Sequence, residues 1–145
     1  MTPDNFDQLS LLVVEDSVAD VFLVKEAIKE EGLKCRIEVA DDGEEAIRIL
    51  DSVDSGSQGP PSLLLVDLNV PRHDGTQVLE RLRRSPRCKS TPVVMMSTSD
   101  TPAERKRAFD LGVTEYFCKP SSLAEFMELG KLVRRLLEEE HGAAA

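Results

Sequence analysis

The sequence contains no long apolar run, and no stretch approaches the roughly 20 apolar residues that a membrane-spanning helix needs. The first ten residues, "MTPDNFDQLS", also lack the basic segment and the apolar segment of a secretory signal peptide. These absences exclude a transmembrane segment and predict a cytoplasmic protein that makes no membrane contact.

Closely spaced cysteine pairs and a net positive charge are also missing. The three cysteines Cys35, Cys88 and Cys118 have no CxxC spacing, which argues against a disulfide framework or a zinc site. Cys35 and Cys118 fall in apolar segments, so we expect buried free thiols there. His73 and His141 are isolated and lack the spacing of metal ligands. With a net charge of −9, the chain is a poor match for nucleic acid.

The 145 residues suit one compact domain, which we expect to span residues 8–140 between flexible termini at 1–7 and 141–145. We expect no output domain. The Gly/Ser/Pro-rich stretch Asp51–Ser62 predicts an exposed loop. The basic run "ERLRRSPRCKS" predicts a solvated helix end, with a docking patch as the alternative.

Apolar segments alternate with segments of helical periodicity along the whole chain. The expected strands are Leu11–Val14, Cys35–Ala40, Leu63–Val66, Val93–Met96 and Tyr116–Cys118. The expected helices begin at the capping residues Ser17, Asp42, Asp74, Thr101 and Ser122. This pattern predicts an α/β fold, a doubly wound (βα)5 parallel sheet. The second strand alternates polar with apolar residues and the fifth is short, so both suit sheet edges, in the order 2-1-3-4-5.

Polar residues follow four of the expected strands. They are Glu15, Asp16, Asp67, Asn69, Ser97, Thr98, Ser99 and Lys119. Because ligands of such sheets bind at the carboxyl ends of the strands, we expect these groups to meet at one mouth. Clustered carboxylates require a cation, and oxygen ligands suit Mg²⁺, while lysine and hydroxyl groups suit phosphoryl oxygens. The chemistry that fits is attack of an aspartate on phosphorus to give an acyl phosphate.

The stretches "LLVVEDS", "LLLVDLNVPRHDG", "PVVMMSTSD" and "GVTEYFCKP" resemble the receiver domain of bacterial two-component response regulators. The resemblance covers nearly the whole chain in the right order. It implies that Asp67 is the phosphoacceptor and that Lys119 contacts the phosphoryl group. It also implies a Mg²⁺ (or Mn²⁺) site formed by Asp16, Asp67, the backbone carbonyl of Asn69, and Glu15 through water.

The resemblance further implies a switch formed by Ser97 and Tyr116, tuning of dephosphorylation by Asn69 and Ser99, and a cis Lys119–Pro120 peptide bond. The output is expected on the face of the fourth helix, fifth strand and fifth helix. The implied donor is a histidine kinase, a hybrid kinase or a phosphotransfer protein. The implied target is an unknown downstream protein, with no direct nucleic acid contact; a homodimer stays open.

The stretches "VEDSVADVFLVKEAI" and "STSD" resemble stand-alone regulators paired with phytochrome-type and related hybrid kinases. Such a protein is an enzyme only toward itself, through its own phosphotransfer and autodephosphorylation. The sequence names neither the cognate kinase nor the lifetime of the acyl phosphate.

Simpler interpretations and two other classes of protein compete with this one. If each residue is considered by itself, Asp67 fits a turn cap, Glu15 and Asp16 fit helix caps, and Tyr116 fits an ordinary residue of the hydrophobic core. A haloacid-dehalogenase-type phosphatase needs a second aspartate where Asn69 stands, and a cap domain. A nucleotide or flavin binder needs a Gly-rich or Ser/Thr-rich loop where "EDSVAD" follows the first strand.

Overall fold

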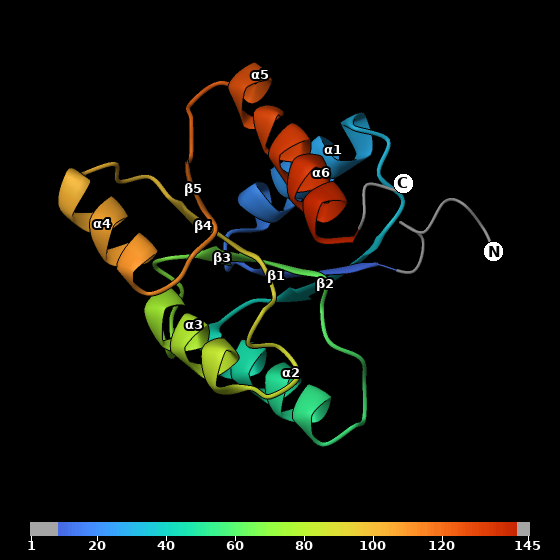
Figure 1. Ribbon diagram of the computed structural model, residues 1–145. Helices are drawn as coiled ribbons and strands as arrows, with labels where there is room; N and C mark the ends of the chain where they lie inside the picture. The colour runs from blue at the N-terminus through green and yellow to red at the C-terminus, as the bar shows by residue number, and fades with distance from the viewer. Residues whose placement is uncertain (1–8, 142–145) are drawn as a thin grey trace.

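The computed structural model describes residues 9–141, which form a central sheet flanked by helices (Figure 1). The elements in order are β1 Ser10–Val14, α1 Val18–Glu30, β2 Arg36–Ala40, α2 Gly43–Asp54, β3 Leu63–Asp67, α3 Gly75–Arg84, β4 Val93–Ser97, α4 Pro102–Asp110, β5 Glu115–Cys118, α5 Leu123–Phe126 and α6 Glu128–His141. All strand pairs are parallel, in the order β2-β1-β3-β4-β5. The predicted fold class, strand order and edge strands are confirmed.

The sheet lies between two helical layers, with α1, α5 and α6 on one face and α2, α3 and α4 on the other (Figure 1). Alternate residues of the central strands point to opposite layers. In β1, Leu12 and Val14 pack toward α2 and α3, whereas Leu11 and Val13 pack toward α1 and α6. Because both faces are covered, β3 is buried along its whole length, and each such apolar side chain contributes about 1.5–3 kcal/mol. The sheet is therefore a rigid platform for the groups at its strand ends.

Each predicted helix start is confirmed by a capping hydrogen bond. The side chain of the N-cap accepts from the backbone N–H three residues later in the pairs Ser17–Asp20, Asp42–Glu45, Asp74–Gln77, Thr101–Glu104 and Ser122–Glu125. At Asp74 the bond is reciprocal, because Gln77 accepts from the Asp74 N–H in a full capping box. These caps fix where each helix leaves the carboxyl end of the preceding strand.

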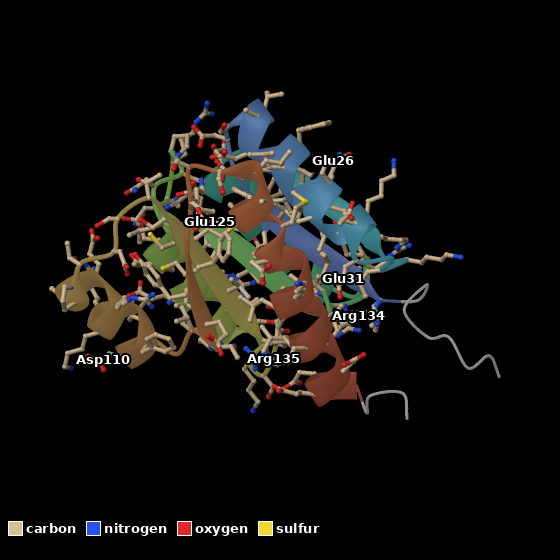
Figure 2. The ribbon with its side chains drawn as sticks, turned by 90° about the horizontal axis from the view of Figure 1, so that it is seen from above. Glu26, Glu31, Asp110, Glu125, Arg134 and Arg135 are labelled. Carbon is tan, nitrogen blue, oxygen red and sulfur yellow. The ribbon has the colours of Figure 1, made fainter. Side chains whose placement is uncertain are left out.

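The C-terminal helix differs from the prediction. It is divided at Met127 into α5 and α6, and α6 runs to His141, one residue past the boundary expected for the domain. The remaining expected flexible residues, 1–7 and 142–145, lie outside the described residues. Side chains of α6 hold its place against α1, since Arg134 Nη2 donates to the Glu31 carbonyl at 2.7 Å (Figure 2).

The loop before β3 and the basic run also differ from the expectation. Helix α2 continues through Asp54, so the loop begins four residues later than predicted. Arg81 of the basic run lies 2.8 Å from both Asp51 and Asp54, and Arg83 Nη1 donates to the Thr91 carbonyl at 2.8 Å. These arginines bind neighbouring segments and do not form a fully solvated helix end.

The cysteines form no disulfide, as predicted, but their burial differs from the expectation. Cys88 is fully buried, whereas Cys35 and Cys118 are half-buried. Within residues 9–141, no helix is long and apolar enough to cross a bilayer.

Candidate functional site

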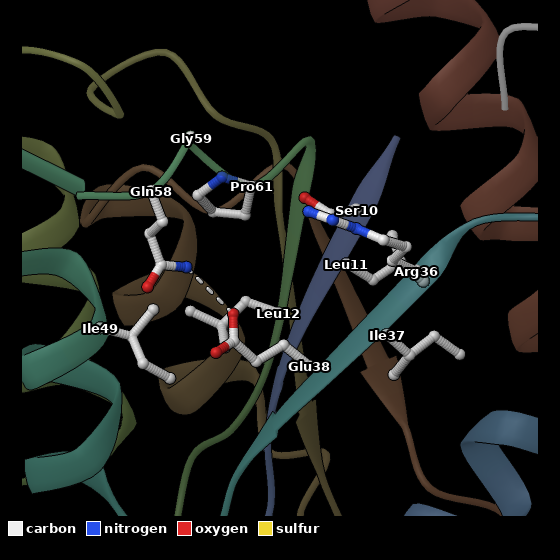
Figure 3. Close-up of a pocket in the computed structure, with 10 residues that line it drawn as sticks. All are labelled: Ser10, Leu11, Leu12, Arg36, Ile37, Glu38, Ile49, Gln58, Gly59 and Pro61. Carbon is white, nitrogen blue, oxygen red and sulfur yellow. Dashed lines mark hydrogen bonds between the residues drawn. The ribbon is translucent and has the colours of Figure 1, made fainter. Parts of the chain in front are cut away.

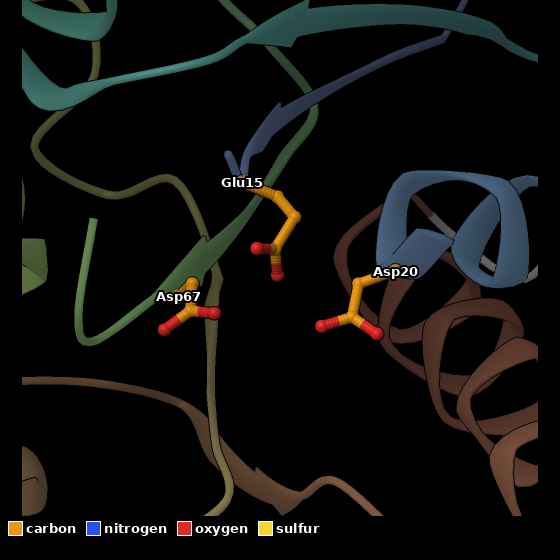
Figure 4. A group of neighbouring side chains, drawn as sticks. All are labelled: Glu15, Asp20 and Asp67. Atoms are coloured by element: carbon orange, nitrogen blue, oxygen red, sulfur yellow. The ribbon is translucent and has the colours of Figure 1, made fainter. Parts of the chain in front are cut away.

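Three carboxylates meet at the carboxyl end of the sheet. Glu15 directly follows β1, Asp67 is the last residue of β3, and Asp20 lies in the first turn of α1. Their side chains converge from these three elements (Figure 4), with one oxygen of each within 4.8 Å of the others. Glu15 is 1% exposed and Asp67 is 7% exposed, so the chain has placed two acids where water solvates them poorly.

The ammonium group of Lys119, which directly follows β5, links the three acids. Its Nζ donates to Glu15 Oε1 at 2.7 Å, to Asp20 Oδ2 at 2.8 Å and to Asp67 Oδ2 at 2.5 Å. An ammonium group has three donors, so each one serves a different carboxylate. When all three carboxylates are ionised, three negative charges face the single positive charge of Lys119.

The pKa values of the site reflect this arrangement. Burial raises the pKa of Glu15 to about 7, although the hydrogen bond from Lys119 opposes the rise. Burial acts to lower the pKa of Lys119, but its bonds to Asp20, Asp67 and Glu15 outweigh that effect and raise it above the usual lysine value. Lys119 is therefore a permanent cation of the site, whereas Glu15 changes charge near neutral pH.

The end of β3 fixes the orientation of Asp67. Its Oδ1 accepts from the Asn69 N–H at 2.8 Å while its Oδ2 accepts from Lys119. The following chain turns back through Gly75, whose N–H donates to the Leu68 carbonyl at 2.9 Å. A Cβ at Gly75 would lie 2.7 Å from the Asp67 carbonyl oxygen, so a side chain there would push α3 away from the site.

Neither of the two predicted switch residues forms a hydrogen bond with the Asp67 side chain. Ser97 is 1% exposed, its Oγ accepts from the Ser99 N–H at 3.0 Å, and its carbonyl accepts from the Lys119 N–H at 2.7 Å. Tyr116 is buried, and its hydroxyl donates to the Ser99 carbonyl at 2.8 Å. The guanidinium carbon of Arg105 lies 4.9 Å from the centre of the Tyr116 ring. Ser99 thus joins Ser97 to Tyr116.

The acids after β1 are arranged differently from the expectation. Asp16 is exposed and stays outside the three-carboxylate group. Its expected role at the metal stays a prediction. Asp20, which was not among the predicted site residues, joins the group instead. A signal was present, since side chains in a helix lean toward its N-terminus and so toward the strand ends.

The prediction of a cis Lys119–Pro120 bond was wrong, because the described residues contain no cis peptide. The trans isomer is the one that X–Pro bonds prefer by about 0.5–1 kcal/mol. In the trans form, the Lys119 N–H still reaches the Ser97 carbonyl and its side chain still reaches the acids.

A cavity of about 380 Å³ lies away from this site (Figure 3). It is lined at the start of β1 and along the edge strand β2, where Gln58 Nε2 donates to Glu38 at 3.2 Å. Ser10 and Arg36, the first residues of these strands, lie at the opposite end of the sheet from the carboxylates. The cavity therefore has no part in the chemistry of the acids.

The donors at the acidic group fit a hard divalent cation. Carboxylate oxygens of Glu15 and Asp67 lie within 4.8 Å of each other, close enough to share one ion, and oxygen ligands of this kind suit Mg²⁺ or Mn²⁺. The raised pKa of Glu15 means that added positive charge would favour its ionised form. The residues present therefore fit the expected metal.

A family model for the response regulator receiver domain matches residues 11–131. The chain belongs to this family. The receiver is 34% identical to the probable methanogenesis regulatory protein FilR2 of Methanothrix harundinacea, covering 91% of this chain and 83% of that protein. It is 32% identical to the response regulator Rcp1 of Synechocystis sp., covering 82% of each.

Solved structures agree with the assignment. The receiver aligns with the crystal structure of the phosphorylated cyanobacterial phytochrome response regulator RcpA at a TM-score of 0.79 and 30% identity, covering 89% of this chain and 93% of that one. The Mn²⁺-bound form of Rcp1 gives a TM-score of 0.77 at 30% identity, with 87% and 91% covered. The predicted resemblance to receivers and to phytochrome-associated regulators is confirmed, and receivers act in two-component signalling and bind divalent metal.

Proposed function

We propose that this receiver accepts a phosphoryl group on Asp67 from a histidine kinase, a hybrid kinase or a phosphotransfer protein. The observation that supports it most is the placement of Asp67 at the mouth of the sheet, with Oδ2 on the Lys119 ammonium at 2.5 Å and Oδ1 on the Asn69 N–H at 2.8 Å. Both contacts keep the carboxylate in one orientation, and positioning supplies much of the catalysis in phosphoryl transfer.

In the proposed reaction, an oxygen of Asp67 forms a bond to phosphorus while the bond from phosphorus to the donor breaks. For a phosphohistidine donor, the leaving imidazole nitrogen keeps the electron pair. Lys119 stabilises the negative charge of the phosphoryl oxygens with an N–H that faces Asp67 in the free protein. Attack of water on phosphorus later releases phosphate and restores the carboxylate.

The proposed metal is Mg²⁺, held by Asp67, Asp16 and the Asn69 carbonyl, and by Glu15 through a water molecule. Bound there, it would neutralise charge on the phosphoryl oxygens and on the acceptor. Glu15 takes part through its ionised form, so the affinity for metal should increase as pH rises through about 7, the pKa of Glu15 in the metal-free protein.

We place the output on the face formed by α4, β5 and the divided fifth helix, α5 with α6, where a downstream protein would bind. A line of hydrogen bonds leads there from the site: the Lys119 N–H to the Ser97 carbonyl, the Ser99 N–H to Ser97 Oγ, and the Tyr116 hydroxyl to the Ser99 carbonyl. When Ser97 Oγ turns to a phosphoryl oxygen, the Ser99 N–H loses its acceptor, and the support of Tyr116 changes. Helix α4 is lightly anchored, with Ala108 as its buried residue.

Labelling with acetyl phosphate tests this function. We expect the wild type to form an acyl phosphate that depends on Mg²⁺, and Asp67→Asn to form none. Asp110→Asn, a change of the same type on exposed α4 (Figure 2), should label as the wild type does. Lys119→Met should label slowly while keeping the circular dichroism of the folded protein. Stable labelling of Asp67→Asn at another residue would contradict the proposal.

A further inference from the structure

Asp20 is an acidic contact of Lys119 that comes from a helix and not from a strand end. It belongs to the first turn of α1, yet its Oδ2 accepts from Lys119 Nζ, 99 positions away in the chain, at 2.8 Å. Its side chain is 27% exposed, whereas that of Lys119 is 8% exposed. The contact joins the start of α1 to the end of β5 across the mouth of the site.

We propose that Asp20 is a positioning residue that holds the Lys119 ammonium for phosphoryl transfer. The proposal rests on the function assigned to Asp67. Glu15 and Asp20 together bind two of the three N–H donors of Lys119, at 2.7 and 2.8 Å. The third donor faces Asp67 Oδ2. A phosphoryl group on Asp67 carries its negative charge on its own oxygens, so this one donor can move to them while the other two stay bound.

Without Asp20, Lys119 loses one of its two anchors. Its side chain has four rotatable methylene bonds, and a lysine side chain gains substantial rotamer freedom when its contacts are removed. The remaining bond to Glu15 fixes a distance but leaves the ammonium free to swing about it. The donor directed at Asp67 would then be present for a smaller fraction of the time.

A simpler role for Asp20 is to complement the N-terminus of α1, where acidic side chains are favourable. That role concerns stability alone and acts without Lys119. The two roles therefore differ in whether the effect of changing Asp20 depends on Lys119, and a double-mutant cycle separates them.

The experiment compares Asp20→Asn with the wild type, with Lys119→Met and with the double variant. Acyl phosphate formation is measured at saturating Mg²⁺ over a range of acetyl phosphate concentrations, and Mn²⁺ binding is measured by electron paramagnetic resonance. Glu26→Gln, which changes another acid of α1 (Figure 2), is the matched control and should leave every value unchanged.

We expect Asp20→Asn to lower the maximal rate about tenfold, because a neutral amide oxygen replaces the charged acceptor and weakens its hydrogen bond to Lys119. The acetyl phosphate concentration at half-maximal rate and the dissociation constant for Mn²⁺ should each stay within about twofold, because Asp20 acts on Lys119. In the Lys119→Met background, Asp20→Asn should slow the reaction less than about twofold.

An unchanged maximal rate in Asp20→Asn would overturn the proposal. The proposal would also be overturned if Asp20→Asn slowed acyl phosphate formation equally in the presence and absence of Lys119. A loss of Mn²⁺ affinity large enough to account for the slowing would overturn it too, because Asp20 would then be a metal ligand. If Lys119→Met does not fold, the comparison of maximal rate, half-saturation and Mn²⁺ affinity in Asp20→Asn decides the question. Labelling that persists in Asp67→Asn would instead refute the function itself.

Discussion

Replacing Glu15 with Gln should stabilise the metal-free protein above neutral pH. Burial raises the pKa of Glu15 from 4.5 to about 7, which corresponds to about 3 kcal/mol of unfavourable free energy for the ionised group. The variant removes this cost. Its amide, however, turns an N–H₂ group toward either Ser17 N or Lys119 Nζ, which donate to the two Glu15 oxygens. That conflict costs about 1–2 kcal/mol, so the expected net gain is about 1–2 kcal/mol.

Urea unfolding followed by circular dichroism, in EDTA near pH 8 and near pH 5, measures this gain. The pKa of Glu15 is higher in the folded state than in the unfolded state, where it is about 4.5. Protonation of Glu15 therefore favours the folded state fully below pH 4.5, and this stabilisation is lost as pH rises through about 7. The advantage of Glu15→Gln should therefore be present near pH 8 and disappear near pH 5. Glu80→Gln, at an exposed position of α3, is the control and should show no such change. A variant that is no more stable than wild type near pH 8, or a difference independent of pH, would refute the reasoning.

Two further substitutions have expected outcomes. Tyr116 is the single tyrosine of a chain without tryptophan, so the fluorescence anisotropy of the protein reports on the mobility of this ring. The anisotropy should fall in Arg105→Ala, because this change removes the cation above the ring. Unchanged anisotropy would count against a packing role for Arg105. Gly130→Ala should destabilise the protein by about 1–3 kcal/mol in thermal or urea unfolding, although alanine usually favours a helix, because its Cβ would collide with the Ala27 carbonyl oxygen. Gly59→Ala, which meets open space, is the matched control, and equal effects of the two changes would contradict this explanation.

Much of the fold could be predicted because its signals are local. Strand composition and the spacing of cap residues gave the five strands and the starts of the helices. The break at Met127 was missed because the apolar stripe from Phe126 through Leu129 continues across it, and periodicity alone does not record an interruption of one residue.

The site was predictable to the extent that it follows from topology. Glu15, Asp67 and Lys119 each stand at the carboxyl end of a strand, and parallel strands bring those ends together. Asp20 was missed because it enters from a helix, and its contact depends on the length of the Lys119 side chain. Glu15 and Asp16 are adjacent acids, so their position after a strand does not tell which of the two is buried and which is exposed.

Chemical mapping of the phosphorylated residue tests the central claim most directly. Reducing an aspartyl phosphate with borohydride converts the aspartate to homoserine, which peptide mass spectrometry locates in the chain. After incubation with Mg²⁺ and acetyl phosphate, we expect homoserine at position 67, and none when Mg²⁺ is replaced by EDTA. Homoserine at another aspartate, or phosphate on a residue other than aspartate with position 67 unmodified, would contradict the assignment of Asp67 as the phosphoacceptor.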